Sequence, residues 1–190
     1  MRRHRVLAAA GGGTVRALVE DALDAIDVDV DPRGDAGSSP GHVGHVYLLR
    51  RGTVRVTAVD DHEARCWYLV VESPDDGAGR EVDDALAAVL PTRTFPELLD
   101  DAEQHPTEHA GAAVRRMALG APDGADPRAL RVLGELLTDP DVGLRTVGVE
   151  AATLTGWREA VPLLERVRDT DADHEMRRFA QVGLDLLASP

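Results

Sequence analysis

The chain has 190 residues, enough for one domain or two small domains with a buried core. Hydrophobic residues make up 43% of it, which excludes a disordered chain, and no apolar run approaches the roughly 20 residues of a membrane span. The net charge is -13, and a surface of this sign repels phosphate backbones, so we expect neither a nucleic-acid nor a membrane partner.

Residue usage points to a prokaryotic, cytoplasmic protein. Lysine and asparagine are absent, which is typical of a GC-rich genome, and acidity without lysine also suits adaptation to salt. The basic start MRRHRVLAAAGGG has an apolar stretch of about six residues, shorter than the roughly 7–15 of a signal peptide. The single cysteine, Cys66, excludes an internal disulfide framework. Because the acidity also suits adaptation to salt, the negative charge by itself does not identify a partner.

Residues 1–92 are predicted to form a small α+β domain. Amphipathic helices are expected at 14–26 and 79–90, and alternating or apolar segments predict strands at 45–52, 53–60 and 64–73. The order α-β-β-β-α predicts a small antiparallel sheet with the helices on one face. The stretch 28–43, rich in glycine, proline and aspartate, is predicted to be a mobile loop.

Three patterns in this domain resemble ligand sites but lack essential parts. The glycines at 11–13 precede a helix without the lysine or the spacing of a phosphate loop. The alternating aspartates of 27–31 lack the glycine and the glutamate that a calcium loop requires further along. The histidines of GHVGH (41–45) and His62 in a nearby turn could bind zinc only together with Cys66, which lies in an apolar segment typical of a core. We expect no catalytic residue, metal or cofactor.

Residues 93–190 are predicted to be helical throughout. Six segments carry apolar residues at three- and four-residue spacing: 94–104, 106–120, 126–139, 139–156, 157–169 and 171–188. Asp126 before Pro127 predicts a helix start, because an N-cap acceptor and a proline at the first helical position are both favoured there. Short links between the segments predict three helical hairpins.

A repeat joins the last four helices. DPDVGLR at 139–145 returns 32 residues later as DADHEMR at 171–177, and in both copies an aspartate precedes an arginine by six positions. The same alignment superposes Gly148 on Ala180 and Ala151 on Gly183, small residues that allow helices to approach closely. A period of this length built from two helices is typical of an α-solenoid.

The segment DPDVGLRTVGVEAATLTGWREAVPLLERVRD (139–169) resembles a HEAT repeat of the bacterial type first noted in phycobilisome lyases. The resemblance covers 94–190, most strongly 127–187, and implies a solenoid of about three helix pairs after the α+β domain. It implies that four residues form a structural ladder of hydrogen bonds along the stack: Asp139, Arg145, Asp171 and Arg177. Lyase activity is not implied, because many unrelated functions use this repeat.

These features predict a non-enzymatic protein–protein interaction module or adaptor whose partner is another protein. The exposed stripes of two neighbouring helices would present a row of arginines to it. The predicted partner-binding residues are Arg128, Arg131, Glu135, Arg158, Glu165 and Arg166. Two alternatives stay open, an acidic inhibitor or mimic that occupies a basic partner's site, and an enzyme on a HEAT-like scaffold.

Overall fold

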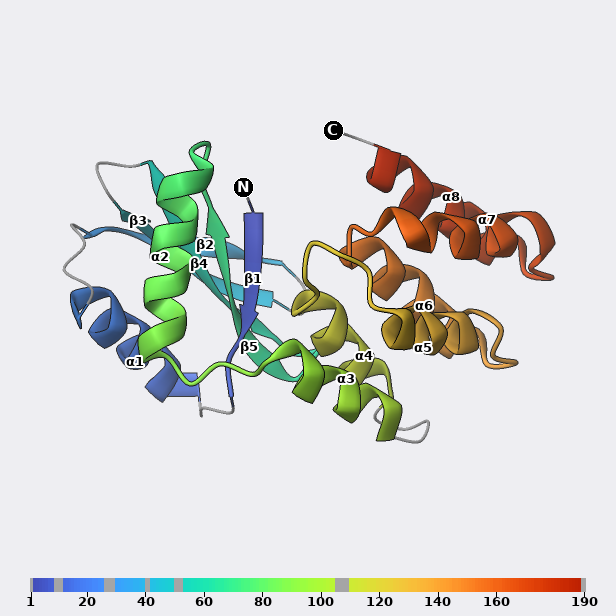
Figure 1. Ribbon diagram of the computed structural model, residues 1–190, viewed down its shortest axis with the longest axis horizontal. Helices are drawn as coiled ribbons and strands as arrows, with labels where there is room; N and C mark the ends of the chain where they lie inside the picture. The colour runs from blue at the N-terminus through green and yellow to red at the C-terminus, as the bar shows by residue number, and fades with distance from the viewer. Residues whose placement is uncertain are drawn as a thin grey trace. The chain divides into compact units, whose positions relative to one another are not determined.

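The computed structural model describes residues 2–8, 12–25, 30–39, 42–49, 53–104 and 110–188. The chain forms two compact units, Met1–Arg93 (unit 1) and Thr94–Pro190 (unit 2), which are described separately (Figure 1). The sequence places the division one residue earlier, between 92 and 93. None of the helices in the described ranges is long and apolar enough to cross a membrane.

Unit 1 combines a five-stranded sheet with two helices. Along the chain its elements are β1 (Arg2–Val6), α1 (Gly12–Ala25), β2 (Val30–Ser39), β3 (His42–Leu49), β4 (Val54–Asp61), β5 (Cys66–Glu72) and α2 (Asp76–Val89). The strand order is β1-β5-β4-β3-β2, and every neighbouring pair is antiparallel. The class is therefore mixed helix and strand, as the sequence predicts.

The sheet has two strands that the sequence did not predict, β1 and β2. The prediction of a mobile loop was wrong over 30–39 and 42–43, which lie in β2 and β3, and residues 28, 29, 40 and 41 lie outside the described part of the chain. Pro32 fits because β2 is an edge strand, where a missing amide hydrogen bond is tolerated. Register shifts between Pro32 and Asp35 and between Asp35 and Ser38 absorb the irregular residues as bulges.

The core of unit 1 lies between the sheet and its helices. In β4 the side chains of Val54, Val56 and Ala58 are buried, whereas Arg55 between them is exposed, as strand alternation requires. The buried residues of α1 and α2 join the same core, so both helices cover one face of the sheet (Figure 1). Asp83 on α2 is fully buried, and its carboxylate accepts two hydrogen bonds of 2.7 Å from Arg5 on β1.

Unit 2 consists of helices, and all six predicted helices are present. They are α3 (Phe95–Gln104), α4 (Ala110–Leu119), α5 (Pro127–Leu137), α6 (Val142–Leu154), α7 (Val161–Thr170, preceded by the 3-10 turn η1, Arg158–Ala160) and α8 (His174–Ala188). The predicted start of α5 is confirmed, since the Asp126 carboxylate accepts hydrogen bonds from the amides of Arg128 (2.7 Å) and Ala129 (3.3 Å).

The helices of unit 2 pack in consecutive pairs, α3 with α4, α5 with α6 and α7 with α8 (Figure 1). The first members α3, α5 and α7 contact one another in sequence and form a first row, and α4, α6 and α8 form a second row. Small residues lie at the close approaches. A Cβ at Gly183 of α8 would stand 2.5 Å from the Thr153 hydroxyl of α6, and a Cβ at Gly148 of α6 would stand 3.1 Å from Leu137 of α5.

Trp157 anchors the turn before η1. Its side chain is buried, its indole Nε1 donates a 2.7 Å hydrogen bond to the Pro122 carbonyl, and its ring meets Phe95 edge-on at 6.1 Å. A buried indole needs such an acceptor, because an unpaired N–H would be costly to desolvate. The contact ties the start of α3 and the α4–α5 link to the start of α7.

Candidate functional site

The two copies of the repeat have the same local geometry at their helix starts. The Asp139 carboxylate accepts the Asp141 amide at 2.8 Å, and the Asp171 carboxylate accepts the Asp173 amide at 2.9 Å. In each copy the carboxylate of the second aspartate accepts a hydrogen bond from a backbone amide in the first turn of the helix. The N···O distance is 2.7 Å for Asp141 and 2.8 Å for Asp173. The D-x-D spacing therefore provides a turn and an N-cap together.

The arginine six positions after the first aspartate closes the same turn. The Arg145 Nη1 donates to the carbonyl oxygen of Asp139 at 2.9 Å and to that of the following residue at 3.0 Å. The Arg177 Nη1 donates to the Asp171 carbonyl at 2.6 Å and to the following one at 3.3 Å. Each arginine is the fourth residue of its helix, so its guanidinium reaches back over the helix start. This geometry explains why the same six-residue spacing between aspartate and arginine occurs in both copies.

One charged contact also joins successive helix pairs. The Arg145 Nε donates to Asp171 Oδ2 at 2.8 Å, and its Nη2 donates to Oδ1 at 3.2 Å. The side chains are only 14% and 6% exposed. Burial disfavours the Asp171 carboxylate, but hydrogen bonds from Asp173 and Arg145 outweigh it and hold its pKa below the ordinary value. Of the four predicted ladder residues, Arg145 and Asp171 thus meet through their side chains.

A charged contact of another kind joins the helix pair before the two copies to the next pair. The guanidinium of Arg115 on α4 binds the Glu150 carboxylate of α6. Glu150 follows Arg145 by five positions, so the acid lies on the next helix of the second row and not at a helix start. Charged contacts therefore join α4 to α6 and α6 to the start of α8.

Two of the four arginines in the predicted row, those on α5, form ion pairs. Arg128 Nη2 lies 2.6 Å from Glu103 Oε2 and 2.7 Å from Asp100 Oδ1, and Arg131 Nη2 lies 2.9 Å from Glu103 Oε1. Hydrogen bonding by Arg128, followed by Arg131, holds the pKa of Glu103 below its ordinary value. Because acids of α3 neutralise both arginines of α5, the α5 part of the row is not a free positive surface.

The α7 part of the row is different. Arg158 and Arg166 are exposed and form no ion pair with any residue in the described part of the chain. Glu165 is also exposed and lies 4.0 Å from Arg168, and Glu135 is exposed on α5. The structure thus leaves two unpaired guanidinium groups beside the first row.

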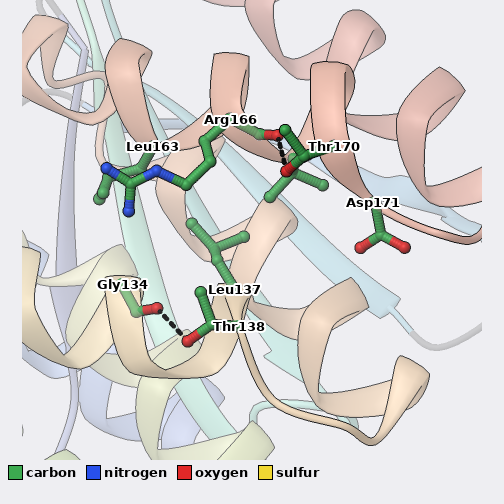
Figure 2. A pocket seen from close by; sticks show the side chains of 8 residues that line it. Gly134, Leu137, Thr138, Leu163, Arg166, Thr170 and Asp171 are labelled. Atoms are coloured by element: carbon green, nitrogen blue, oxygen red, sulfur yellow. Dashed lines mark hydrogen bonds between the residues drawn. The ribbon is translucent and has the colours of Figure 1, made fainter.

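A small groove lies between α5 and α7, next to one of these groups. Its volume is about 60 Å³, and its apolar lining, called the floor below, is formed by Leu137, Leu163 and Val167. Leu137 and Leu163 face each other from the two helices (Figure 2). Gly134 contributes no side chain at the wall: a Cβ there would stand 3.8 Å from Leu163. In the sequence, the available signal for a groove was the glycine inside α5.

The rim of the groove is polar. The hydroxyl of Thr138 donates to the Gly134 carbonyl at 3.0 Å, and that of Thr170 donates to the Arg166 carbonyl at 2.8 Å (Figure 2). Each hydroxyl oxygen is therefore left with lone pairs that can accept a hydrogen bond. The Arg166 side chain extends along the groove toward Leu163 (Figure 2). Arg166, Thr138 and Thr170 thus line the same groove as the apolar floor.

The patterns weighed in residues 1–92 add no site to this one. Asp27 and Asp29, and the side chains of Asp31, His42 and His45, lie outside the described part of the chain. Cys66 is half-buried at the start of β5. Within the described ranges, no three His, Cys, Asp or Glu side chains are grouped to hold a metal ion. Comparisons with known protein families, curated proteins and solved structures find no match to this chain.

Proposed function

We propose that residues 94–190 are a HEAT-like α-solenoid that acts as a non-enzymatic protein-binding module, and that its first row carries the partner-binding face. The observation that carries this proposal is the exposed, unpaired Arg166 beside the apolar groove between α5 and α7. An apolar depression with a charged rim is the usual form of an interface anchor.

The arrangement of the helices supports the HEAT-like part of the proposal. Two rows of helices pack with a repeated aspartate–arginine turn, and the Arg145–Asp171 contact joins one pair to the next. In such a stack each pair contacts mainly its neighbours, so the outer surface of a row is continuous and accessible. The buried charges hold the stack, and the exposed ones are available to a partner.

The charge balance supports the choice of face. Residues 91–190 contain 11 arginines against 18 acidic residues, yet Arg158 and Arg166 are not paired with a described acid. An unpaired guanidinium on an acidic chain attracts a carboxylate of a partner and can bind it through two hydrogen bonds. We therefore place the partner contact at Arg158 and Arg166 and not at Arg128 and Arg131.

The test compares charge reversals on the two rows in the full chain. Arg166→Glu alters the proposed face, and Arg178→Glu makes the same charge change on α8, where Arg178 is 69% exposed. Each variant is used to capture partners from a lysate of the source organism, with quantification by mass spectrometry and a melting temperature for each. We expect Arg166→Glu to lose the partner at least about tenfold, at unchanged stability, and Arg178→Glu to retain it.

Equal retention by both variants, or equal loss, would contradict the proposed face. The same experiment separates the module from an acidic mimic. A mimic binds through its carboxylates, so Arg166→Glu would leave its binding intact or strengthen it, and binding would fall steeply with salt.

A further inference from the structure

We propose that the α5–α7 groove binds the C-terminal residue of a partner protein, with its aliphatic side chain on the groove floor and its carboxylate on Arg166. This inference rests on the proposed function and specifies what the first row recognises. Three properties of the groove lead to it: its size, its uncompensated charge and the hydrogen-bonding capacity of its rim.

The size of the groove limits the side chain. A cavity of about 150 Å³ takes benzene, with six carbon atoms, so about 60 Å³ takes two or three carbons. Three carbons form the side chain of valine. The floor of Leu137, Leu163 and Val167 is apolar and offers no polar partner, so an aliphatic side chain fits it and a polar one does not.

The charge of the groove selects a carboxylate. Asp171 also lines the groove, but its carboxylate is engaged by Arg145 at 2.8 Å and 3.2 Å and does not neutralise Arg166. The Arg166 guanidinium lies along the same groove as the apolar floor (Figure 2). A carboxylate that binds it must therefore stand close to the aliphatic side chain.

A chain end places these groups on a single residue. Its α-carboxylate and its side chain share one carbon atom, whereas an internal acid carries its carboxylate on a second residue, beyond the one whose side chain fills the groove of about 60 Å³. The same residue carries a backbone N–H, and the hydroxyl oxygens of Thr138 and Thr170 are acceptors on the rim. Terminal carboxylates are a recurring target of protein recognition.

Small fragments test this in the full-length, ¹⁵N-labelled chain by NMR. N-acetyl-valine carries the side chain and the α-carboxylate, N-acetyl-valinamide lacks the charge, and N-acetyl-glycine lacks the side chain. A fourth fragment, the amide of N-acetyl-valyl-glutamate, carries its only carboxylate on a side chain. The reporters are the Gly134 amide and the Arg166 Nε–H, with the Arg178 Nε–H as the control away from the groove.

We expect N-acetyl-valine to shift both groove reporters at millimolar concentration, and the other three fragments to bind at least about fivefold more weakly. Arg166→Gln should abolish the preference for N-acetyl-valine over its amide, whereas Arg178→Gln should preserve it. Equal binding of the acid and the amide, equal binding of the internal acid, or shifts confined to other residues would overturn the inference.

The fragment-binding test and the partner-capture test of the proposed function can fail independently of each other. If Arg166→Glu loses the natural partner while N-acetyl-valine leaves Gly134 unshifted, the first row binds a partner but not through a chain end. If N-acetyl-valine binds the groove while Arg166→Glu retains the partner, the groove recognises a chain end and the partner-binding face lies elsewhere.

Discussion

Replacing Arg145 by methionine removes the guanidinium that joins two helix pairs while keeping much of the side-chain volume. The wild-type guanidinium makes two bonds to the Asp171 carboxylate and two to backbone carbonyls. The Asp171 carboxylate is 6% exposed in the wild-type chain. In the variant it keeps the bond from the Asp173 amide and the nearby charge of Arg177 but loses both bonds from Arg145. The cost arises mainly from the loss of these charged hydrogen bonds.

The magnitude follows from the burial of the pair. Removing one partner of a fully buried ion pair costs about 3–5 kcal/mol, and the 14% exposure of Arg145 permits some solvent screening. We therefore expect a loss of about 2–4 kcal/mol in the free energy of unfolding of unit 2. The double variant Arg145→Met with Asp171→Leu removes both charges, so it should be more stable than Arg145→Met alone, with a coupling of about 2 kcal/mol.

Urea unfolding provides the measurement, because unit 2 contains a buried tryptophan. The chain has two tryptophans, so a Trp67→Phe background leaves Trp157 as the reporter of unit 2. Arg178→Met serves as the control, since Arg178 is 69% exposed and should change stability little. A coupling between positions 145 and 171 below about 0.5 kcal/mol would refute the structural role of this contact.

The same pair predicts an acid dependence. The pKa of Asp171 is lower in the folded chain than its ordinary value of about 3.9, so its contribution to stability is complete above that value. It is lost as pH falls through the folded-state pKa. In Arg145→Met this part of the acid transition should shrink, which pH-dependent urea unfolding can detect.

Three further outcomes are expected elsewhere. Gly183→Ala should destabilise unit 2 by about 1–2 kcal/mol, because the new Cβ meets the Thr153 hydroxyl at 2.5 Å, and Thr153→Ala in the same chain should recover the loss. Asp83→Ala should cost unit 1 about 3 kcal/mol in urea unfolding, since it removes the partner of Arg5 in a pair whose carboxylate is fully buried. Burial lowers the pKa of His4 to about 4. The stability that unit 1 gains from keeping this imidazole neutral is therefore complete above about pH 6.5 and is lost as pH falls toward 4. That loss reaches up to about 3 kcal/mol, and His4→Phe should remove it.

The helices of unit 2 were predictable because their signals are local. Asp126 and Pro127 mark the start of α5 regardless of the rest of the fold, and apolar spacing marks the buried stripe. The repeat placed Arg145 and Asp171 in equivalent turns, and the resemblance to a HEAT repeat implied that they belong to a structural ladder. The strand β2 could not be predicted in this way, because its pairing with β3 overrides the local preferences of Pro32 and its neighbouring glycines.

The candidate site was less accessible from sequence, because it depends on contacts between helices. Arg128 and Arg131 lie on the predicted exposed face, but their partners Asp100 and Glu103 come from α3, 25 to 28 residues earlier. No periodicity within α5 reveals that neutralisation. The groove likewise results from Gly134 of α5 meeting Leu163 of α7, so it appears only when the two helices are packed.

The proposed binding face of the first row is tested most directly by photocrosslinking in cells of the source organism. A benzoyl-phenylalanine is placed at position 162 of the full chain, where Pro162 is exposed one helical turn before Arg166, so that Arg166 itself is kept. In a second variant it is placed at position 178 on the second row. The adducts are then identified by mass spectrometry. We predict one dominant protein adduct at position 162, linked near that protein's C-terminus, and no such adduct at position 178. The same adduct at position 178 and none at position 162 would contradict a partner-binding face on the first row.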